Sequence, residues 1–321
     1  KNKILETLIE EHINNKLIKN IDINSWKQKK VLSKIKSMIN HWEVFPENYL
    51  LQYIKDNNSF LDKQEHHLLT MSIQYGQEDM TKYIFKNWNF DFKEEKSITV
   101  KDRYYYPIKL SGPLGDIHLF LAVILGYEEI ADMLLGCEDI NPNFYNKYSN
   151  QTLLSVSTWY GDVGITERLL SHPKVDLITP LINGQPQWVD SLSNCAFHGY
   201  TPILDKLLSF DVVNPNQGDT QLSDQVPLII AIERNNYEII KRLLECPNIN
   251  TNIREYFSGD PLLHFAIRMK DYSLLEILLD SPKFDLNERN DDQLTIMDLI
   301  YLKDDSLSLR IVLDKIRLER I

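Results

Sequence analysis

Five pairs of adjacent leucines recur through the middle of the sequence at a nearly constant step, and this step constrains the fold more than any other feature. The pairs, whose successive offsets are 35, 38, 36 and 35 residues, are Leu134-Leu135, Leu169-Leu170, Leu207-Leu208, Leu243-Leu244 and Leu278-Leu279. Sequence periods of about 20 to 50 residues indicate repeat architectures, in which each unit packs only on its neighbours. The sequence therefore predicts a stacked array of small units.

Each leucine pair stands in the same frame of small, apolar and turn residues. A small side chain stands twelve residues before the pair, and an apolar residue four positions before it adds an i, i+4 contact. Eight residues before the pair are the turn positions Gly126, Gly161, Gly199, Asn235 and Lys270. Gly and Asn tolerate the left-handed conformation that ends many helices. The frame thus predicts a mainly α protein with two short antiparallel helices per unit, followed by turns rich in Pro, Asn and Asp.

This pattern resembles the ankyrin repeat, whose signature runs T-P-L-H-x-A, then G, then V-V-x-x-L-L, then G-A-D-V-N. One unit reads Pro261-Leu-Leu-His264-Phe-Ala266, and Asp285-Leu-Asn287 follows its leucine pair. The resemblance is clearest over residues 115–288, extends over about 64–315, and fits the longer-turn variant of the family. It implies an ankyrin-type helix-turn-helix solenoid of about seven units with short β-turn fingers. It also implies that the His264 ring hydrogen-bonds backbone in a turn.

The frame divides the chain into two predicted parts. Residues 1–62 do not fit it and consist of amphipathic helices, which predicts an N-terminal helical module or cap. Residues 63–321 form the repeat array, with insertions near 91–113 and 180–190. The basic amphipathic segment from Trp26 to Ile39 suits a solvated cap helix or, alternatively, a calmodulin target or a membrane-surface helix.

The charge is unevenly distributed and bears on the class of partner. Of the formal net charge of −11, residues 1–40 contribute nine Lys and four Asp/Glu, so that the remainder carries −16. Nucleic-acid binding needs clustered Lys and Arg, so we expect no nucleic-acid partner and instead a protein with a basic face. No apolar run reaches the roughly 18 residues of a membrane span, and we expect none.

The three cysteines are the residues most able to carry chemistry, and the frame accounts for them structurally. Cys137 and Cys246 both lie two residues after a leucine pair, and Cys195 occupies the small-residue position. An odd count without C-x-x-C spacing favours a reducing, intracellular and cytoplasmic setting without disulfides or structural zinc. His198 follows Cys195 by three residues, but no orienting acid accompanies it. The segment from Gly112 to Gly115 lacks the Lys-Ser/Thr ending of a phosphate loop. We therefore expect no catalytic residue, metal or cofactor, and no enzyme.

Aromatic residues are the candidate partner-binding residues, because they bring a large contact area with few torsions to freeze. Trp159 and Tyr160 are expected at the end of a first helix, rotated away from its core face. The other candidates lie in turns and insertions and are Tyr145, Tyr148, Trp188, Tyr256, Phe257, Arg103, Tyr104 and Tyr105. The first two of these are expected to form one patch with Trp159 and Tyr160, rimmed by Asp162. The run from Arg103 to Pro107 suits either a partner loop or a β-hairpin packed on the array.

Together these features predict a monomeric protein–protein interaction scaffold that binds its partner on the concave ankyrin surface. The alternative is an adaptor or targeting part of an enzyme whose catalytic region lies in the N-terminal module or outside this sequence. Heavy use of Asn, Ile and Lys is typical of AT-rich genomes. With ankyrin units, it fits a protist protein or a bacterial effector that is secreted into a host cell.

Overall fold

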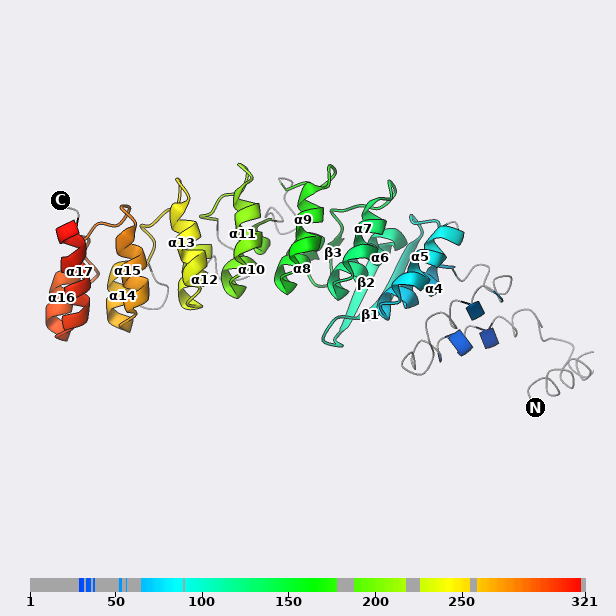
Figure 1. The fold of residues 1–321 in the computed structure, drawn as a ribbon, viewed down its shortest axis with the longest axis horizontal. Coiled ribbons are helices and arrows are strands. Elements are labelled where there is room, and N and C mark those ends of the chain that lie inside the picture. The colour runs from blue at the N-terminus through cyan, green and yellow to red at the C-terminus, as the bar shows by residue number, and fades with distance from the viewer. Residues whose placement is uncertain are drawn as a thin grey trace, which may run out of the picture. The chain divides into compact units, whose positions relative to one another are not determined.

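In the computed structural model, helices follow one another in pairs, and within each of two compact units the successive pairs lie side by side (Figure 1). The described residues are 65–88, 90–177, 188–217, 226–254 and 259–318, with isolated residues between 29 and 56. The predicted N-terminal module and the insertion near 180–190 lie almost wholly outside them. Contacts within the chain define two compact units, Lys1–Ile140 (unit 1) and Asn141–Ile321 (unit 2), and each is described by itself.

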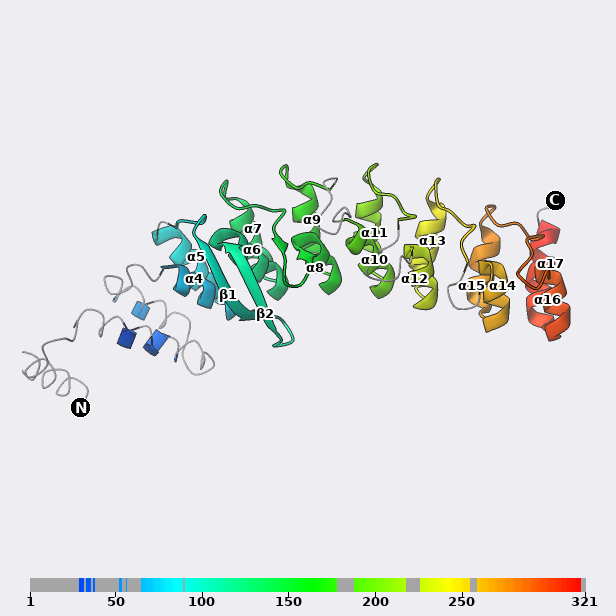
Figure 2. The same cartoon turned by 180° about the vertical axis from the view of Figure 1, so that it is seen from behind.

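Unit 1 holds two described helix pairs and a long β-hairpin. Its elements are α4 (Glu65–Gln74), α5 (Glu78–Asn87), β1 (Glu95–Lys101), β2 (Pro107–Pro113), α6 (Leu114–Leu125) and α7 (Glu128–Leu135). The strands pair antiparallel, with Val100 opposite Ile108 and Ile98 opposite Leu110. Val100 and Leu110 are buried, and both strands contact α6. The insertion near 91–113 therefore forms a β-hairpin that packs on its own unit, and Figure 2 shows the hairpin tip extending beyond the helix ends.

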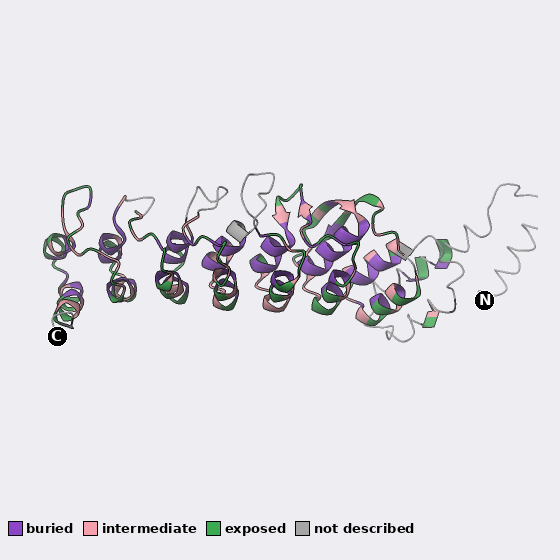
Figure 3. Ribbon diagram, turned by 90° about the horizontal axis from the view of Figure 1, so that it is seen from above, coloured by how far each residue is buried: buried purple, intermediate pink, exposed green. Residues whose placement is uncertain are grey.

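Unit 2 holds five described helix pairs around one continuous core. Its elements are β3 (Tyr145–Asn146), β4 (Gln151–Thr152), α8 (Leu153–Tyr160), α9 (Val163–Ser171), α10 (Trp188–His198), α11 (Thr201–Leu208), α12 (Pro227–Glu233), α13 (Tyr237–Glu245), α14 (Leu262–Met269), α15 (Tyr272–Asp280), α16 (Ile296–Lys303) and α17 (Ser306–Leu318). The core runs from Leu154 to Val312 without interruption. Figure 3 shows buried residues along the helices and exposed residues on their outer faces.

The leucine frame corresponds to equivalent places in the structure. The first leucine of every pair is completely buried, and Leu169 and Leu243 occupy corresponding positions in α9 and α13. Truncating such a leucine to alanine typically costs about 2–5 kcal/mol. The predicted mainly helical, repeat-based fold is confirmed.

The turn positions that end the first helices are left-handed, as the frame predicts. The φ angles are +80° at Gly126, +72° at Gly161, +81° at Gly199, and +55° at both Asn235 and Lys270. A side chain at Gly161 would also clash, because its Cβ would lie 2.6 Å from the Tyr200 ring of the next helix pair. Glycine is therefore required there for two independent reasons.

Side-chain amides link successive turns in unit 2. Asn143 donates to the Lys174 carbonyl at 2.7 Å and accepts from the Asp176 amide at 2.9 Å. Asn216 repeats both bonds with the backbone of Asn248 and Asn250, at 2.7 and 2.6 Å. The predicted role of His264 is also confirmed, because its Nε2 lies 2.9 Å from the Leu294 carbonyl in the next turn.

Candidate protein-binding surface

Trp159 lies one residue before the end of α8, and its ring stacks on a ring of the next repeat. The centroids of Trp159 and Phe197 are 6.1 Å apart with an interplanar angle of 27°. Trp159 stands ten residues before Leu169, and Phe197 stands ten residues before Leu207. Equivalent positions of neighbouring repeats face each other, so the shared frame explains why the two rings meet. Trp159 nevertheless keeps 43% of its surface exposed.

The stack continues from Phe197 into the following repeat. The guanidinium carbon of Arg234, which directly follows α12, lies 3.5 Å from the Phe197 ring centroid. The His198 ring meets Trp159 edge-on at 4.7 Å and stacks on Tyr200 at 5.3 Å. We call these five residues the aromatic ladder: Trp159, Phe197, His198, Tyr200 and Arg234. Its members come from three successive helix pairs, so it forms a surface that no single repeat could supply.

Hydrogen bonds to the backbone fix the middle of the aromatic ladder. The side-chain amide of Asn236 donates to the carbonyls of Ala196 and Phe197 at 2.7 and 3.1 Å. These carbonyls lie in the last turn of α10, where no helical amide follows to bind them. The Tyr200 ring is held in turn against the backbone of Gly161. The ladder is therefore preorganised, which lowers the entropy lost when a partner binds.

Arg234 supplies the positive charge of the aromatic ladder at neutral pH. Burial, and then the positive charge of Arg234, hold the pKa of His198 below its ordinary value. The imidazole is therefore uncharged, and it presents ring surface to Trp159 and Tyr200.

The other aromatic candidates of this repeat lie close to it in sequence. Tyr160 ends α8 and is partly buried. Tyr145 lies in β3, where its hydroxyl donates to the Asn150 side chain at 2.8 Å. Tyr148 is exposed in the turn between β3 and β4, with the Lys147 ammonium 5.5 Å from its ring centroid. The ring contacts described for Trp159 run to the next repeat, and a single patch of these residues with Trp159 stays a prediction.

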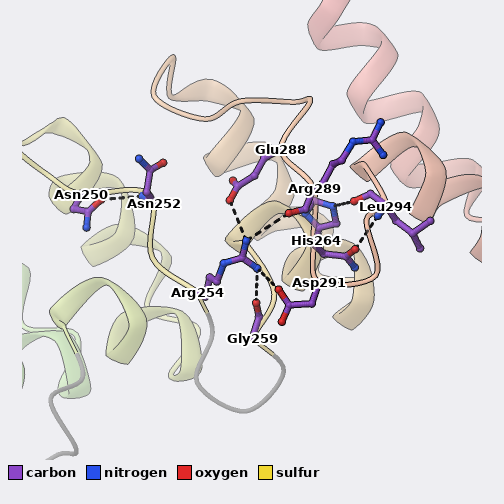
Figure 4. Close-up of polar contacts among 10 residues, drawn as sticks. Asn250, Asn252, Arg254, Gly259, His264, Glu288, Arg289, Asp291 and Leu294 are labelled. Carbon is purple, nitrogen blue, oxygen red and sulfur yellow. Dashed lines mark hydrogen bonds and ion pairs between the residues drawn. The ribbon is translucent and has the colours of Figure 1, made fainter.

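Three candidates lie outside the described part of the chain in whole or in part. Trp188 begins α10, but its side chain lies outside the described residues, as do Tyr256 and Phe257. The backbone on both sides of the last two is described and is clamped by Arg254 (Figure 4). This guanidinium donates to the Gly259 carbonyl at 2.8 Å and to the Asp291 carboxylate at 3.1 Å. It thereby ties one turn to the next, a role that nothing in the sequence indicated.

Arg103, a sequence candidate for partner binding, makes structural contacts within unit 1, and a role in partner binding stays a prediction. Its Nε donates to the Ile124 carbonyl at 2.8 Å, and a terminal nitrogen donates to the Val123 carbonyl at 3.1 Å. The guanidinium thus caps the end of α6, where Gly126 leaves room for it. The neighbouring Tyr104 and Tyr105 are exposed at the hairpin tip.

The cysteines occupy structural positions. The thiols of Cys137 and Cys246 donate to the carbonyls four residues earlier, each at 3.6 Å. Burial raises the pKa of the Cys195 thiol far above its ordinary value, so this sulfur is not a thiolate nucleophile. Within the described ranges, no group of three or more His, Cys, Asp or Glu could hold a metal ion. The helices in the described part of the chain are too short or too polar to cross a membrane.

Comparison with known proteins agrees with the fold. Residues 192–290 match the family of ankyrin repeats in three copies. The structure is similar to the ankyrin repeat domain of Bcl-3, described as a member of the IkappaB protein family, with a TM-score of 0.53 and 19% identity over 78% of this chain and 97% of that one. It is also similar to the human ASB11 ankyrin repeat domain, with a TM-score of 0.51 and 20% identity over 76% and 96% of the two chains. No curated protein matches the sequence.

Proposed function

We propose that this chain, which carries ankyrin repeats and has the ankyrin fold, is a scaffold whose partner protein binds on the aromatic ladder. Ankyrin repeats generally mediate protein–protein interaction. The observation that carries the assignment to this surface is the stack of Trp159 on Phe197, which is preorganised and yet leaves Trp159 43% exposed. Trp and Arg are enriched among the few interface residues that dominate binding energy.

The negative charge of the chain indicates the chemistry of the partner. The chain after residue 40 carries a formal charge of −16, which attracts a basic partner and speeds its association. The face of an exposed indole attracts a cation within about 6 Å. We therefore propose a partner that presents a lysine or arginine beside apolar side chains, with the cation placed over Trp159.

The substitution Trp159→Ala tests this function. Truncating a central aromatic anchor often costs about 2 kcal/mol of binding energy, so the dissociation constant is expected to rise roughly thirtyfold. The thermal midpoint is expected to change little, because the ring is half-exposed. Partners would be captured with the full chain and identified by mass spectrometry, and titration calorimetry would measure their affinity for both forms.

Tyr301→Ala is a matched control, because Tyr301 lies near the end of the first helix α16 and is 66% exposed. Its loss is expected to leave the affinity unchanged. If Trp159→Ala lowered stability while each folded molecule still bound normally, Trp159 would be a packing residue and the binding surface would lie elsewhere.

Two narrower features belong to the same proposal. The chain acts as a monomer, which sedimentation of the free protein would test. An effector role inside a host cell rests on composition alone, and capture from host-cell lysate compared with bacterial lysate would test it.

A further inference from the structure

The backbone of β1 presents an edge that β2 does not use. The side-chain amide of Gln74 donates to the Lys101 carbonyl at 3.0 Å, and its oxygen accepts from the Lys101 amide at 3.2 Å. The Asp102 amide points the other way and donates to the Tyr106 carbonyl at 3.0 Å. Since inward and outward residues alternate along a strand, Thr99 and Ser97 point outward with Lys101.

Gln74 thus binds the backbone of Lys101 as one residue of a third strand would, and the outward backbone groups of the neighbouring Thr99 and Ser97 are open. In the described part of the chain, no hydrogen bond joins the outward backbone groups of Thr99 and Ser97 to a partner. Unpaired strand edges readily accept another extended chain. The outer edge of β1 therefore has the geometry for strand addition.

The outer edge of β2 does not have the geometry for strand addition. The same alternation turns Pro107, Lys109, Ser111 and Pro113 outward on β2. Proline has no amide to donate, and it is typical of strand edges that are closed to pairing. The hairpin therefore has one blocked edge and one open edge.

A cleft lies at the tip end of the hairpin in unit 1 and reaches the open edge of β1 at Thr99 and Lys101. Its volume is about 860 Å³, and its lining also includes Tyr75, Tyr105 and Leu125. Ligand pockets commonly measure about 300–1,000 Å³, so the cleft can hold a short extended peptide. A second copy of this folded chain would have to bring its own helices to the same edge, which makes a single peptide strand the better occupant.

The two faces of the hairpin predict the side chains of such a peptide. The exposed face carries Lys101, with Lys109 directly opposite Thr99. Across residues 95–113 there are four Lys/Arg and two Asp/Glu, so this segment is basic although the chain as a whole is acidic. The other face carries the buried Val100, and Leu125 and Tyr75 line the cleft. Cross-strand pairing favours opposite charges, so a matching strand alternates acidic and apolar residues.

The hairpin tip also supports peptide binding at this cleft. Tyr105 has a φ of +65° and is 78% exposed. This is the third position of a three-residue hairpin loop, where glycine is usual because the conformation is left-handed. The Asp102 carboxylate holds the loop by accepting from the amides of Tyr104 and Tyr106 at 2.9 and 2.8 Å. An aromatic ring kept at an unfavourable backbone position beside the cleft has the properties of a binding residue.

We propose that the open edge of β1 binds an extended, acidic segment of a partner protein as a third strand, with its acidic side chains beside Lys101 and its apolar side chains in the cleft. This site lies in unit 1, whereas the aromatic ladder lies in unit 2, so the two proposals stand on separate observations.

The probe is a fluorescein-labelled octapeptide that alternates glutamate and valine, titrated against the full chain by fluorescence anisotropy. The same peptide methylated on every backbone nitrogen, and an octapeptide of lysine and valine, serve as probe controls. Only the unmethylated acidic peptide is expected to bind, and it is expected to slow hydrogen exchange of the Ser97 and Thr99 amides. Binding of the methylated or the lysine peptide with equal affinity would overturn the proposal.

Matched proline variants separate the two edges. Thr99→Pro removes an outward amide from the open edge and is expected to weaken binding about tenfold. Ser111→Pro makes the same kind of change on the blocked edge and is expected to leave the affinity unchanged. Lys101→Glu keeps the backbone and is expected to weaken binding by reversing the charge, whether or not the proline variants fold. Equal affinity of wild type and Lys101→Glu, or self-association through β1 detected by sedimentation, would each show that an acidic peptide is not the occupant.

Discussion

In units 1 and 2, a side chain from another segment binds the last carbonyls of the first helix of a pair, but the two units use different side chains. In unit 2, Asn236 of the following repeat binds the last carbonyls of α10. In unit 1, Arg103 of the β1–β2 hairpin binds the last carbonyls of α6. Asn236 therefore couples one repeat to the next, whereas Arg103 couples a hairpin to its own unit. The comparison shows that an insertion can take over a contact that ordinarily holds a repeat array together.

The two units also differ in the strand pair that precedes a first helix. The strands β3 and β4 have two residues each, and β1 and β2 have seven each. A two-residue finger is only a turn, and its position depends on neighbouring turns through bonds such as those of Asn143. The long hairpin has its own ladder and buries Val100 and Leu110 on its inner face. Unit 1 thus gains a strand edge that a short finger does not offer.

The largest expected effect comes from removing the Arg103 cap. Hydrogen bonds to charged groups contribute about 1.5–3 kcal/mol, so Arg103→Met is expected to lower the stability of unit 1 by about that amount. Hydrogen exchange should quicken in α6 and in the hairpin, and little in α14 and α15. The counterpart Asn236→Ala removes an uncharged donor and is expected to cost about 1 kcal/mol, with faster exchange in both α10 and α12. Equal spreading of both effects along the chain would remove the distinction between the two caps.

A smaller effect is expected from acid, and it falls mainly on unit 1. Burial in α6, and then the charge of the nearby His66, lower the pKa of His118 to about 3 from 6.5. Between these values the unfolded chain binds a proton that the folded chain does not, so stability falls as the pH drops below 6.5. The loss at pH 5 is about 2 kcal/mol, and there is none above the unfolded pKa. The pKa of His198 in unit 2 is lowered too, but that ring is partly exposed, so a smaller effect is expected there.

The measurement is the pH dependence of hydrogen exchange in α6 compared with α14, in wild type and in His118→Gln. The variant is expected to flatten the dependence in α6 while leaving that of α14 unchanged. An unchanged slope in α6 would show that His118 is protonated in the folded protein.

The smallest expected effect is a gain in stability at the hairpin tip. Tyr105→Gly relieves the left-handed strain of a non-glycine residue and is expected to stabilise unit 1 by up to about 1 kcal/mol. The same change removes a ring from the cleft beside β1, so binding of the acidic octapeptide should weaken as stability rises. Thermal melting and anisotropy on one sample would show whether the two quantities move in opposite directions. A loss of stability would mean that the Tyr105 ring is a packing residue.

The sequence by itself determined the parts of this protein that repeat. The leucine pairs and the left-handed positions such as Lys270 follow from residues at fixed offsets within one unit. The His264 contact was implied by the resemblance to the ankyrin repeat. Period and local conformation are short-range properties, so one chain suffices to infer them. Trp159 could also be predicted as exposed, because its helical position is rotated away from the core.

Only the tertiary structure decided which residues meet across repeats. Phe197 stands at the position equivalent to Trp159, a signal that the sequence analysis could have used, but the stack on Arg234 depends on how neighbouring repeats pack. Arg103 reaches α6 because the hairpin folds back on its own unit, and Arg254 reaches Asp291 across 37 residues of sequence. The open edge of β1 depends on the direction in which Gln74 points from α4. The separations between Trp159, Phe197 and Arg234, and between Arg254 and Asp291, are about one repeat, so the period predicts that their repeats are neighbours. Which side chains of those repeats meet depends on the packed structure.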